Sequence, residues 1–380
     1  MKLTRHARAA TAFAVSAAAL STTLAACGSD DANDASADGG GTKATIGVLY
    51  VGPHTDFGYN QAAYEGIQEL KKARPDIKVL EAENVPETAE ASRVMEKMIK
   101  DGATVIIPTS YGHYQPALEV AAKHPDVNFL HQGGPKAVKP NVGTYFGQIY
   151  EAQYLTGIAA GLSTKTDKLG YVVAFPIPQT LLNINAFELG AKSVNPKVKT
   201  TVVFTASWCD PAKQTEAAKS LLDQGADVLS QHQDCTKTVV ETTERAGAMS
   251  VGYHADASSL APKGWLTGSV WNWGPLYTKM VDAALGDDFS SSPYAGVYRV
   301  GIEDPTIALA PFGASVSDET KAKVEEAEKK MRADELQAFT GPIKDQSGKV
   351  VIPAGESPDA ATLEATDYLV EGVIGNIPKS

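Results

Sequence analysis

Short apolar runs alternate with amphipathic stretches of helical length from residue 43 onward. Such runs predict buried strands, and apolar positions spaced three to four residues apart between them predict helices. In the first half, the predicted strands cover residues 77–80, 104–108, 127–131 and 142–146, and the predicted helices cover residues 88–100, 113–123 and 150–162. The apolar run from Val105 to Ile107 is continuous, as expected of a strand covered on both faces. This half is therefore predicted to be a doubly wound α/β layer.

The same scheme starts again at Lys168. The predicted strands are 169–174, 200–204, 227–230 and 249–252, and the predicted helices are 180–193, 213–223 and 237–245. Two similar halves predict two α/β lobes that face each other across a cleft. We expect an N-terminal lobe over residues 43–150, completed by segments near 272–305, and a C-terminal lobe over residues 151–270. Residues 306–380 are expected to complete the lobes, with a charged surface helix at 317–332 and, from residue 339, short strands packed as an irregular flap.

The stretch from Gly47 to Gly66 predicts a strand, a loop and a helix in succession. In an open parallel sheet, ligands bind beyond the carboxyl ends of the strands, so Asp56, Tyr59 and Asn60 in this loop are candidate ligand contacts. A Tyr face can stack on a ring, and Asp and Asn can hydrogen-bond the edge of a flat polar molecule. The alternative is that Asp56 and Asn60 only cap the helix.

Aromatic and polar residues gather at the other predicted strand ends as well. They are Ser110, Tyr111, Gly112 and Tyr114, then residues 175–178, residues 207–211, His232 and Asp234, then Tyr253, His254 and Asp256, and finally residues 271–274. Each position alone is weak evidence, because aromatic residues near strand ends are commonly ordinary packing. Their accumulation at one kind of position predicts a pocket for a planar heterocycle.

The N-terminus has the three parts of an export signal. Basic residues are followed by an apolar run over residues 9–19 and then by Leu24-Ala25-Ala26-Cys27, which is typical of a lipoprotein cleavage site. We expect residues 1–26 to be a signal peptide, Cys27 to carry lipid, and residues 27–42 to be a flexible tether. An ordinary secretory cleavage or a transmembrane anchor are the alternatives, although the apolar run is short for a span. The protein is therefore expected on the outer face of the plasma membrane.

The formal net charge of −11 argues against nucleic-acid binding by phosphate neutralisation. Cys209 and Cys235 each follow a predicted strand of the second half, and neighbouring strands would bring both loops to one sheet edge. In an exported protein this favours a disulfide over two free thiols. His232 lies near Cys235, but no spacing completes a metal site, so we expect none.

Three motifs resemble the basic membrane protein family of substrate-binding lipoproteins, which includes purine nucleoside receptors that feed ABC importers. Asp56-Phe57-Gly58-Tyr59-Asn60-Gln61 resembles the family's D-x-S-F-N-Q loop. Residues 207–211 resemble its G-S-F-x-D-P, and Gly252-Tyr253-His254-Ala255-Asp256 resembles its G-x-D-x-D. The resemblance covers essentially all of the chain after the export signal. It implies a type I periplasmic binding protein fold, with two α/β lobes joined by three crossovers around a ligand cleft.

Residue by residue, the resemblance implies that Tyr59 and Trp208 sandwich a base between the lobes. Asp56 and Asn60 would meet polar edges of the ligand, and Asp256 matches an Asp that contacts it. His254 replaces another Asp, and Asn272 stands where nucleoside binders have a sugar-contacting Lys. We therefore expect a purine nucleobase, with a nucleoside as second choice. The full candidate ligand-binding set is Asp56, Tyr59, Asn60, Tyr111, Phe175, Trp208, Asp234, Asp256, Asn272 and Trp273.

The resemblance implies binding without bond making, in which the lobes close over the ligand and a permease recognises the closed form. The sequence has no Walker A motif, so the ATPase and the permease are expected to be separate chains. We expect a monomer that needs no cofactor. The alternatives are a surface sensor for a small metabolite and, less favoured, a nucleoside hydrolase, since no catalytic spacing is evident.

Overall fold

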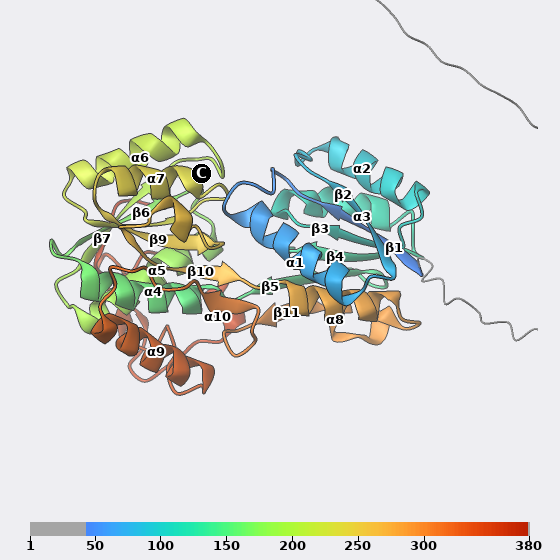
Figure 1. Cartoon of the computed structure of the whole chain (residues 1–380). Helices are drawn as coiled ribbons and strands as arrows, with labels where there is room; N and C mark the ends of the chain where they lie inside the picture. The colour runs from blue at the N-terminus through green and yellow to red at the C-terminus, as the bar shows by residue number, and fades with distance from the viewer. Residues whose placement is uncertain (1–42, 379–380) are drawn as a thin grey trace, which may run out of the picture. The chain divides into compact units, whose positions relative to one another are not determined.

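The computed structural model describes residues 43–378 (Figure 1). The expected signal peptide, the lipidated Cys27 and the tether lie outside the described residues. Within the described chain, the strands form two large sheets and one small hairpin. Helices alternate with the strands of the two large sheets along the chain. This is the α/β arrangement expected from the alternation of apolar runs and amphipathic stretches.

The first sheet has the strand order β11-β5-β4-β3-β1-β2, and all its pairs are parallel. Its strands are β1 (Ala44–Leu49), β2 (Ile77–Ala82), β3 (Val105–Pro108), β4 (Asn128–Gln132), β5 (Val142–Gly147) and β11 (Val297–Val300). Its helices are α1 (Tyr59–Ala73), α2 (Ala89–Lys100), η1 (Tyr111–His113), α3 (Tyr114–Ala121), α8 (Gly274–Leu285), η3 (Phe289–Ser291) and η4 (Pro293–Ala295). Val105 and Ile107 join one apolar core and Ile106 joins another, so β3 is covered on both faces.

The second sheet has the order β12-β10-β9-β8-β6-β7-β15, parallel except for β12 against β10. Its strands are β6 (Lys168–Val173), β7 (Lys199–Phe204), β8 (Val228–His232), β9 (Met249–His254), β10 (Trp265–Trp271), β12 (Ile307–Leu309) and β15 (Val373–Ile374). Its helices are α4 (Tyr150–Ser163), α5 (Pro178–Val194), α6 (Pro211–Asp223), α7 (Lys237–Arg245), η2 (Ser258–Leu260) and α9 (Asp318–Arg332). Helices α4 and α5 pack with their backbones in close approach: a Cβ on Gly190 would lie 1.9 Å from the Tyr154 carbonyl oxygen.

Short elements of the C-terminal half carry too little pattern for their bounds to be predicted. Strand β11 and helix α10 (Ala360–Leu363) were not expected. The tail was expected to carry short strands, and it contains the antiparallel pair β13 (Ile343–Lys344) and β14 (Val350–Ile352) and the strand β15. Strand β15 pairs with β7, so the tail extends the second sheet instead of forming only an irregular flap. Runs of two to four residues show neither the strand nor the helix period.

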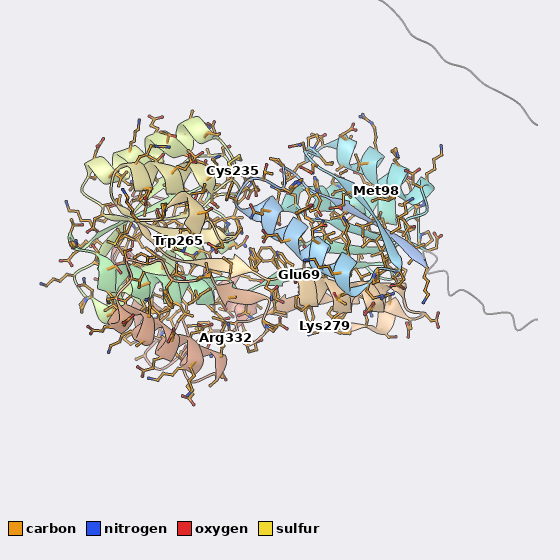
Figure 2. The ribbon with its side chains drawn as sticks, in the orientation of Figure 1. Glu69, Met98, Cys235, Trp265, Lys279 and Arg332 are labelled. Atoms are coloured by element: carbon orange, nitrogen blue, oxygen red, sulfur yellow. A yellow bond between two sulfur atoms is a disulfide. The ribbon has the colours of Figure 1, made fainter. Side chains whose placement is uncertain are left out.

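The chain crosses between the sheets where β5 leads to α4, where β10 leads to α8 and where β11 leads to β12. Side chains of two helices hold the last crossover. Glu151 at the start of α4 accepts a hydrogen bond from the Ile302 N–H at 2.6 Å. Arg332, labelled at the end of α9 in Figure 2, donates to the carbonyl oxygens of Ile302 and Ile307. Helix α9 therefore fixes a crossover, beyond the solvated surface role expected from its sequence.

Two buried carboxyl groups are expected to make the protein less stable as the pH rises. Burial raises the pKa of Glu188 to about 7, although the Thr200 hydroxyl donates to it at 2.7 Å, and burial raises the pKa of Glu151 to about 7 as well. An unfolded glutamate has its ordinary, lower pKa, so between the two values the unfolded state binds fewer protons. The free energy of unfolding therefore falls as the pH rises through this window.

We predict that Glu188→Gln removes much of this pH dependence. A pKa difference of this size corresponds to at most about 3 kcal/mol of unfolding free energy per group. Urea unfolding at about pH 5 and about pH 8 measures the difference directly. Glu325→Gln, on the exposed side of α9, is the matched control and should keep the wild-type difference. An unchanged pH dependence in Glu188→Gln would contradict the assignment.

Candidate functional site

A cavity lies where the carboxyl ends of strands from both sheets meet. Its empty volume is about 510 Å³, including the part open to solvent. It is lined by Tyr59, Glu87, Ser110, Tyr111, Gly133, Phe146, Ile177, Gln179, Trp208, His232, Asp234 and His254. These residues come from the ends of β1 to β9 or from the segments that follow them. The position of the cavity follows the rule for open parallel sheets.

Four of the predicted site residues line this cavity: Tyr59, Tyr111, Trp208 and Asp234. The Tyr59 hydroxyl donates to the Thr109 carbonyl oxygen at 2.5 Å, which fixes its ring. The Trp208 ring packs edge-on against Phe175, with ring centroids 5.3 Å apart. Phe175 is not among the lining residues, so its contact with the cavity is indirect, through the position of Trp208.

Asp56 and Asn60 organise the loop that carries Tyr59. The Asp56 carboxylate accepts hydrogen bonds from the backbone N–H groups of Gly58, Asn60 and Gln61 at 2.8 to 3.0 Å. The Asn60 side chain donates to Asp56 at 2.8 Å and accepts from the Gly52 N–H at 3.0 Å. Both side chains are buried and absent from the cavity lining. The geometry matches the capping alternative: they satisfy the start of α1 and thereby hold Tyr59 in place.

The structure does not bring Asp256, Asn272 or Trp273 to the cavity lining. Asp256 is exposed and accepts from the Ser258 N–H at 2.9 Å, just past the end of β9. Asn272 and Trp273 lie in the crossover that follows β10, which turns away toward α8. Trp273 is 1% exposed and stacks on Trp271 in the core, with centroids 4.6 Å apart. A residue that follows a strand can line the cavity only if the chain turns over the cavity at that point, and the chain after β10 crosses to α8 instead.

Several lining residues were missed by the sequence analysis: Glu87, Gly133, Phe146 and Gln179. Glu87 follows β2, and its carboxylate accepts hydrogen bonds from the Ser110 hydroxyl and, at 2.9 Å, from the Gly112 N–H. Gly133 and Phe146 lie at the ends of β4 and β5. The strand-end rule used elsewhere would have found Glu87, Gly133 and Phe146, had it been applied to β2, β4 and β5. Gln179 lies one residue past the segment 175–178, which the rule did mark.

Two histidines and one aspartate of the cavity have pKa values shifted toward their neutral forms. Burial lowers the pKa of His232 to about 3 and holds the pKa of His254 well below its usual range. Burial, the Asp56 carboxylate and then the Glu87 carboxylate raise the pKa of Asp234 well above its usual range. No group in residues 43–378 donates a hydrogen bond to the Asp234 side chain. The cavity thus presents neutral imidazoles and one unpartnered carboxyl group.

Loops of the two lobes touch beside the cavity. The Tyr59 N–H donates to the Asp234 carbonyl oxygen at 3.0 Å, and the Thr236 hydroxyl donates to the Phe57 carbonyl oxygen. Gly58 lies between these contacts, where a Cβ would stand 1.9 Å from the Asp234 carbonyl oxygen. The absence of a side chain at Gly58 is therefore a condition of this contact.

A disulfide joins Cys209 to Cys235, whose Cα atoms are 5.3 Å apart. Cys235 is labelled in Figure 2. The expectation that the two preceding strands are neighbours was wrong, because β6 lies between β7 and β8. The two loops meet beyond the end of β6 instead. The disulfide ties the loop of Trp208 to the loop of Asp234, since each cysteine directly follows one of these residues.

The profile of a family described as "ABC transporter substrate-binding protein PnrA-like" matches residues 43–338. The chain belongs to this family. It is similar to a purine-binding protein of Brucella abortus, with 36% identity over 89% of this chain and 95% of the relative. It is also similar to a putative ABC transporter glucose-binding protein of Haloferax volcanii, with 31% identity over 90% of this chain and 84% of the relative.

Solved structures support the fold of this PnrA-like protein. An ABC transporter solute-binding protein of Aeropyrum pernix K1 aligns with a TM-score of 0.65 and 16% identity, over 85% of this chain and 96% of that one. A solute-binding protein of Conexibacter woesei aligns with a TM-score of 0.61 and 22% identity, over 77% of this chain and 98% of that one. The type I periplasmic binding protein fold expected from the sequence is confirmed.

Substrate-binding proteins of this kind act outside the cytoplasm, bind small molecules and work with a permease and an ATPase. The family is one of binding proteins, not of enzymes. No helix within residues 43–378 has both the length and the apolar character that a membrane crossing requires. In the same part of the chain, no group of three His, Cys, Asp or Glu side chains is arranged to hold a metal ion.

Proposed function

We propose that this PnrA-like protein captures a purine nucleobase between its lobes and delivers it to an ABC importer. The observation that carries the proposal is the chemistry of the cavity between the lobes that Tyr59 and Trp208 line. It combines the rings of Tyr59 and Trp208 with polar groups that can recognise the edge of a base. The similarity to a purine-binding relative supports the same ligand class.

The ring faces and the polar groups have separate roles in this proposal. Each aromatic contact with a base should contribute about 1 kcal/mol beyond the burial of its area. The carboxyl group of Asp234 gains a partner when a ligand N–H reaches it, and hydrogen bonds to charged groups are the stronger ones. Contacts made to both lobes at once stabilise the closed arrangement, which is the form that a permease would recognise.

A nucleoside is the second candidate because a second cavity adjoins the first. It has an empty volume of about 910 Å³, including space open to solvent, and shares Tyr111, Gly133, Phe146, Ile177 and Gln179 with the first cavity. Gln148 and Arg299 also line it and offer hydrogen-bond donors. A ribose attached to the base would have room there. None of the twelve residues that line the first cavity is Lys or Arg, which argues against an anionic ligand.

We further propose that residues 1–26 are removed, that lipid on Cys27 holds the protein at the outer face of the plasma membrane, and that the protein acts as a monomer. A metabolic label of palmitate tests the anchor. Incorporation into the wild type and not into Cys27→Ser supports it, and equal labelling of both contradicts it. The proposal of purine binding does not depend on the lipid anchor, since all the residues that line the cavity lie between residues 59 and 254.

The ligand class is tested by thermal-shift titration of the purified protein with nucleobases, nucleosides, sugars including glucose, and amino acids. A ligand that binds only the folded state raises the melting temperature as its concentration rises. The proposal predicts this rise with adenine, guanine or hypoxanthine. A rise with glucose alone would align the chain with its haloarchaeal relative and would overturn the purine assignment.

Asp234→Asn is predicted to weaken purine binding by tenfold or more. The variant keeps the shape of the side chain but loses the charge-assisted acceptor, which is worth about 1.5 to 3 kcal/mol. A ligand N–H favours the ionised form of Asp234, so wild-type affinity should rise with pH because the pKa of this carboxyl is raised. Calorimetric titration at about pH 6 and about pH 8 measures both effects.

The matched control for this prediction is Asp256→Asn. Asp256 is exposed and outside the cavity lining, so its variant should keep the wild-type affinity and its rise with pH. In Asp234→Asn the affinity should be the same at both pH values. An Asp234→Asn protein that retains both the wild-type affinity and the wild-type pH dependence would remove Asp234 from the site.

A further inference from the structure

His254 ends strand β9 in an uncommon backbone conformation. Its φ is +70°, in the left-handed region that L-residues enter at a cost, and its side chain is 1% exposed. Strain of this kind persists only where the surroundings enforce it, and it gathers at ligand sites. The conformation places the imidazole among the residues that line the cavity, edge-on to Tyr59 with ring centroids 5.1 Å apart.

One hydrogen bond fixes which nitrogen of His254 carries the proton. The indole N–H of Trp271 donates to Nδ1 of His254 at 2.8 Å. An indole nitrogen can only donate, so Nδ1 must be the unprotonated, accepting nitrogen. Burial keeps the pKa of His254 well below its usual range, so the ring is neutral. A neutral ring with a bare Nδ1 carries its proton on Nε2.

This Nε2–H is a buried donor without an acceptor anywhere in residues 43–378. A buried polar group left unpaired costs about 1 to 3 kcal/mol, and such groups are rare in folded proteins. His254 lines the same cavity as the unpartnered carboxyl of Asp234. His254 and Asp234 therefore offer a ligand a fixed donor and an unpartnered carboxyl acceptor.

We infer that His254 is a specificity-determining ligand contact, whose Nε2–H donates to an unprotonated ring nitrogen or a carbonyl oxygen on the edge of the bound heterocycle. The inference rests on the proposed function and refines it. The ligand must present an acceptor to His254 and an N–H to Asp234. A purine base has both kinds of group on its rim, whereas a hydrocarbon ring has neither.

Calorimetric titration of the purified protein with adenine and its 1-deaza, 3-deaza and 7-deaza analogues tests the inference. Each analogue replaces one ring nitrogen by C–H and keeps the shape. Loss of a hydrogen bond to His254 should weaken binding of one analogue by about tenfold. If guanine binds instead of adenine, its 3-deaza and 7-deaza analogues, and 2-aminopurine for the carbonyl oxygen, take their place.

The variant His254→Phe removes the same hydrogen bond from the protein side, so that variant and analogue together form a double-mutant cycle. It should bind adenine about tenfold more weakly than the wild type and should no longer distinguish adenine from the sensitive analogue. Because Phe is strained at positive φ, His254→Asn is the second variant: Asn tolerates this region but is too short to place its amide where Nε2 lies. A purely structural role would weaken all the ligands equally and preserve the discrimination.

Three results would overturn the inference. In the first, every deaza analogue binds the wild type as tightly as the parent base. In the second, the discrimination persists in both His254 variants. In the third, ¹⁵N NMR of histidine-labelled protein without ligand shows the His254 proton on Nδ1. If purines bind and any of these occurs, only the role of His254 fails; if no purine binds, the proposed function fails and this inference with it.

Discussion

Gly58→Ala is expected to weaken purine binding by about a hundredfold while both lobes stay folded. The new Cβ would stand 1.9 Å from the Asp234 carbonyl oxygen, which is backbone and cannot rotate aside. The same oxygen accepts the Tyr59 N–H, so the contact between the loops of the two lobes would be lost or strained. Overpacking typically costs 1 to 3 kcal/mol, and the upper end corresponds to about a hundredfold.

This loss should appear in binding and not in stability, because the core around Phe129 in one lobe and the core around Leu229 in the other do not include the contact between the loops. Calorimetric titration with the purine and urea unfolding measure the two quantities. Gly286→Ala is the matched control: it lies past the end of α8, with φ −78°, and its Cβ would meet no atom closer than 3.4 Å. Wild-type affinity in Gly58→Ala would contradict the role given to this loop contact.

Trp208→Ala is expected to lower purine affinity by about a hundredfold as well. The variant removes a ring that lines the cavity. The stacking contact with the base and the apolar area that the ring buries against the base are lost together, at a cost of about 2 to 4 kcal/mol of binding free energy. Trp208 is only half-buried, so the free energy of unfolding should change little. The disulfide at Cys209 keeps the loop anchored in the variant.

Trp208→Phe separates stacking from shape. A phenyl ring can still stack, so its affinity should lie between those of Trp208→Ala and the wild type. Calorimetric titration with one purine gives all three values. Equal affinities of the wild type and Trp208→Ala would show that the base does not bind against this ring.

The fold could be predicted from the sequence wherever one element carries its own pattern. The continuous run around Ile106 indicated a strand buried on both faces, and β3 is such a strand. Strand order could not be predicted, because it depends on how helices cross the sheet. The insertion of β6 between β7 and β8 is an example. The two-residue β15 became a strand only because the edge of β7 was free to pair.

The site could be predicted as far as the strand-end rule applies. Tyr59 and Tyr111 begin helices, and Trp208 and Asp234 lie in loops, where the chain leaves a strand end beside the cavity. Trp273 does not line the cavity, because the chain after β10 crosses toward α8 and buries the indole in the core. The sequence left Asp56 between ligand contact and helix capping, and the three backbone N–H groups from which its carboxylate accepts hydrogen bonds favour capping.

A crystal structure of the protein grown with adenine would show whether a purine lies between Tyr59 and Trp208. We expect density for the base in the cavity lined by these two residues, with its faces against the two rings and its edge toward Asp234 and His254. Density for the base at another site, or none in crystals grown at saturating adenine, guanine and hypoxanthine in turn, would contradict it.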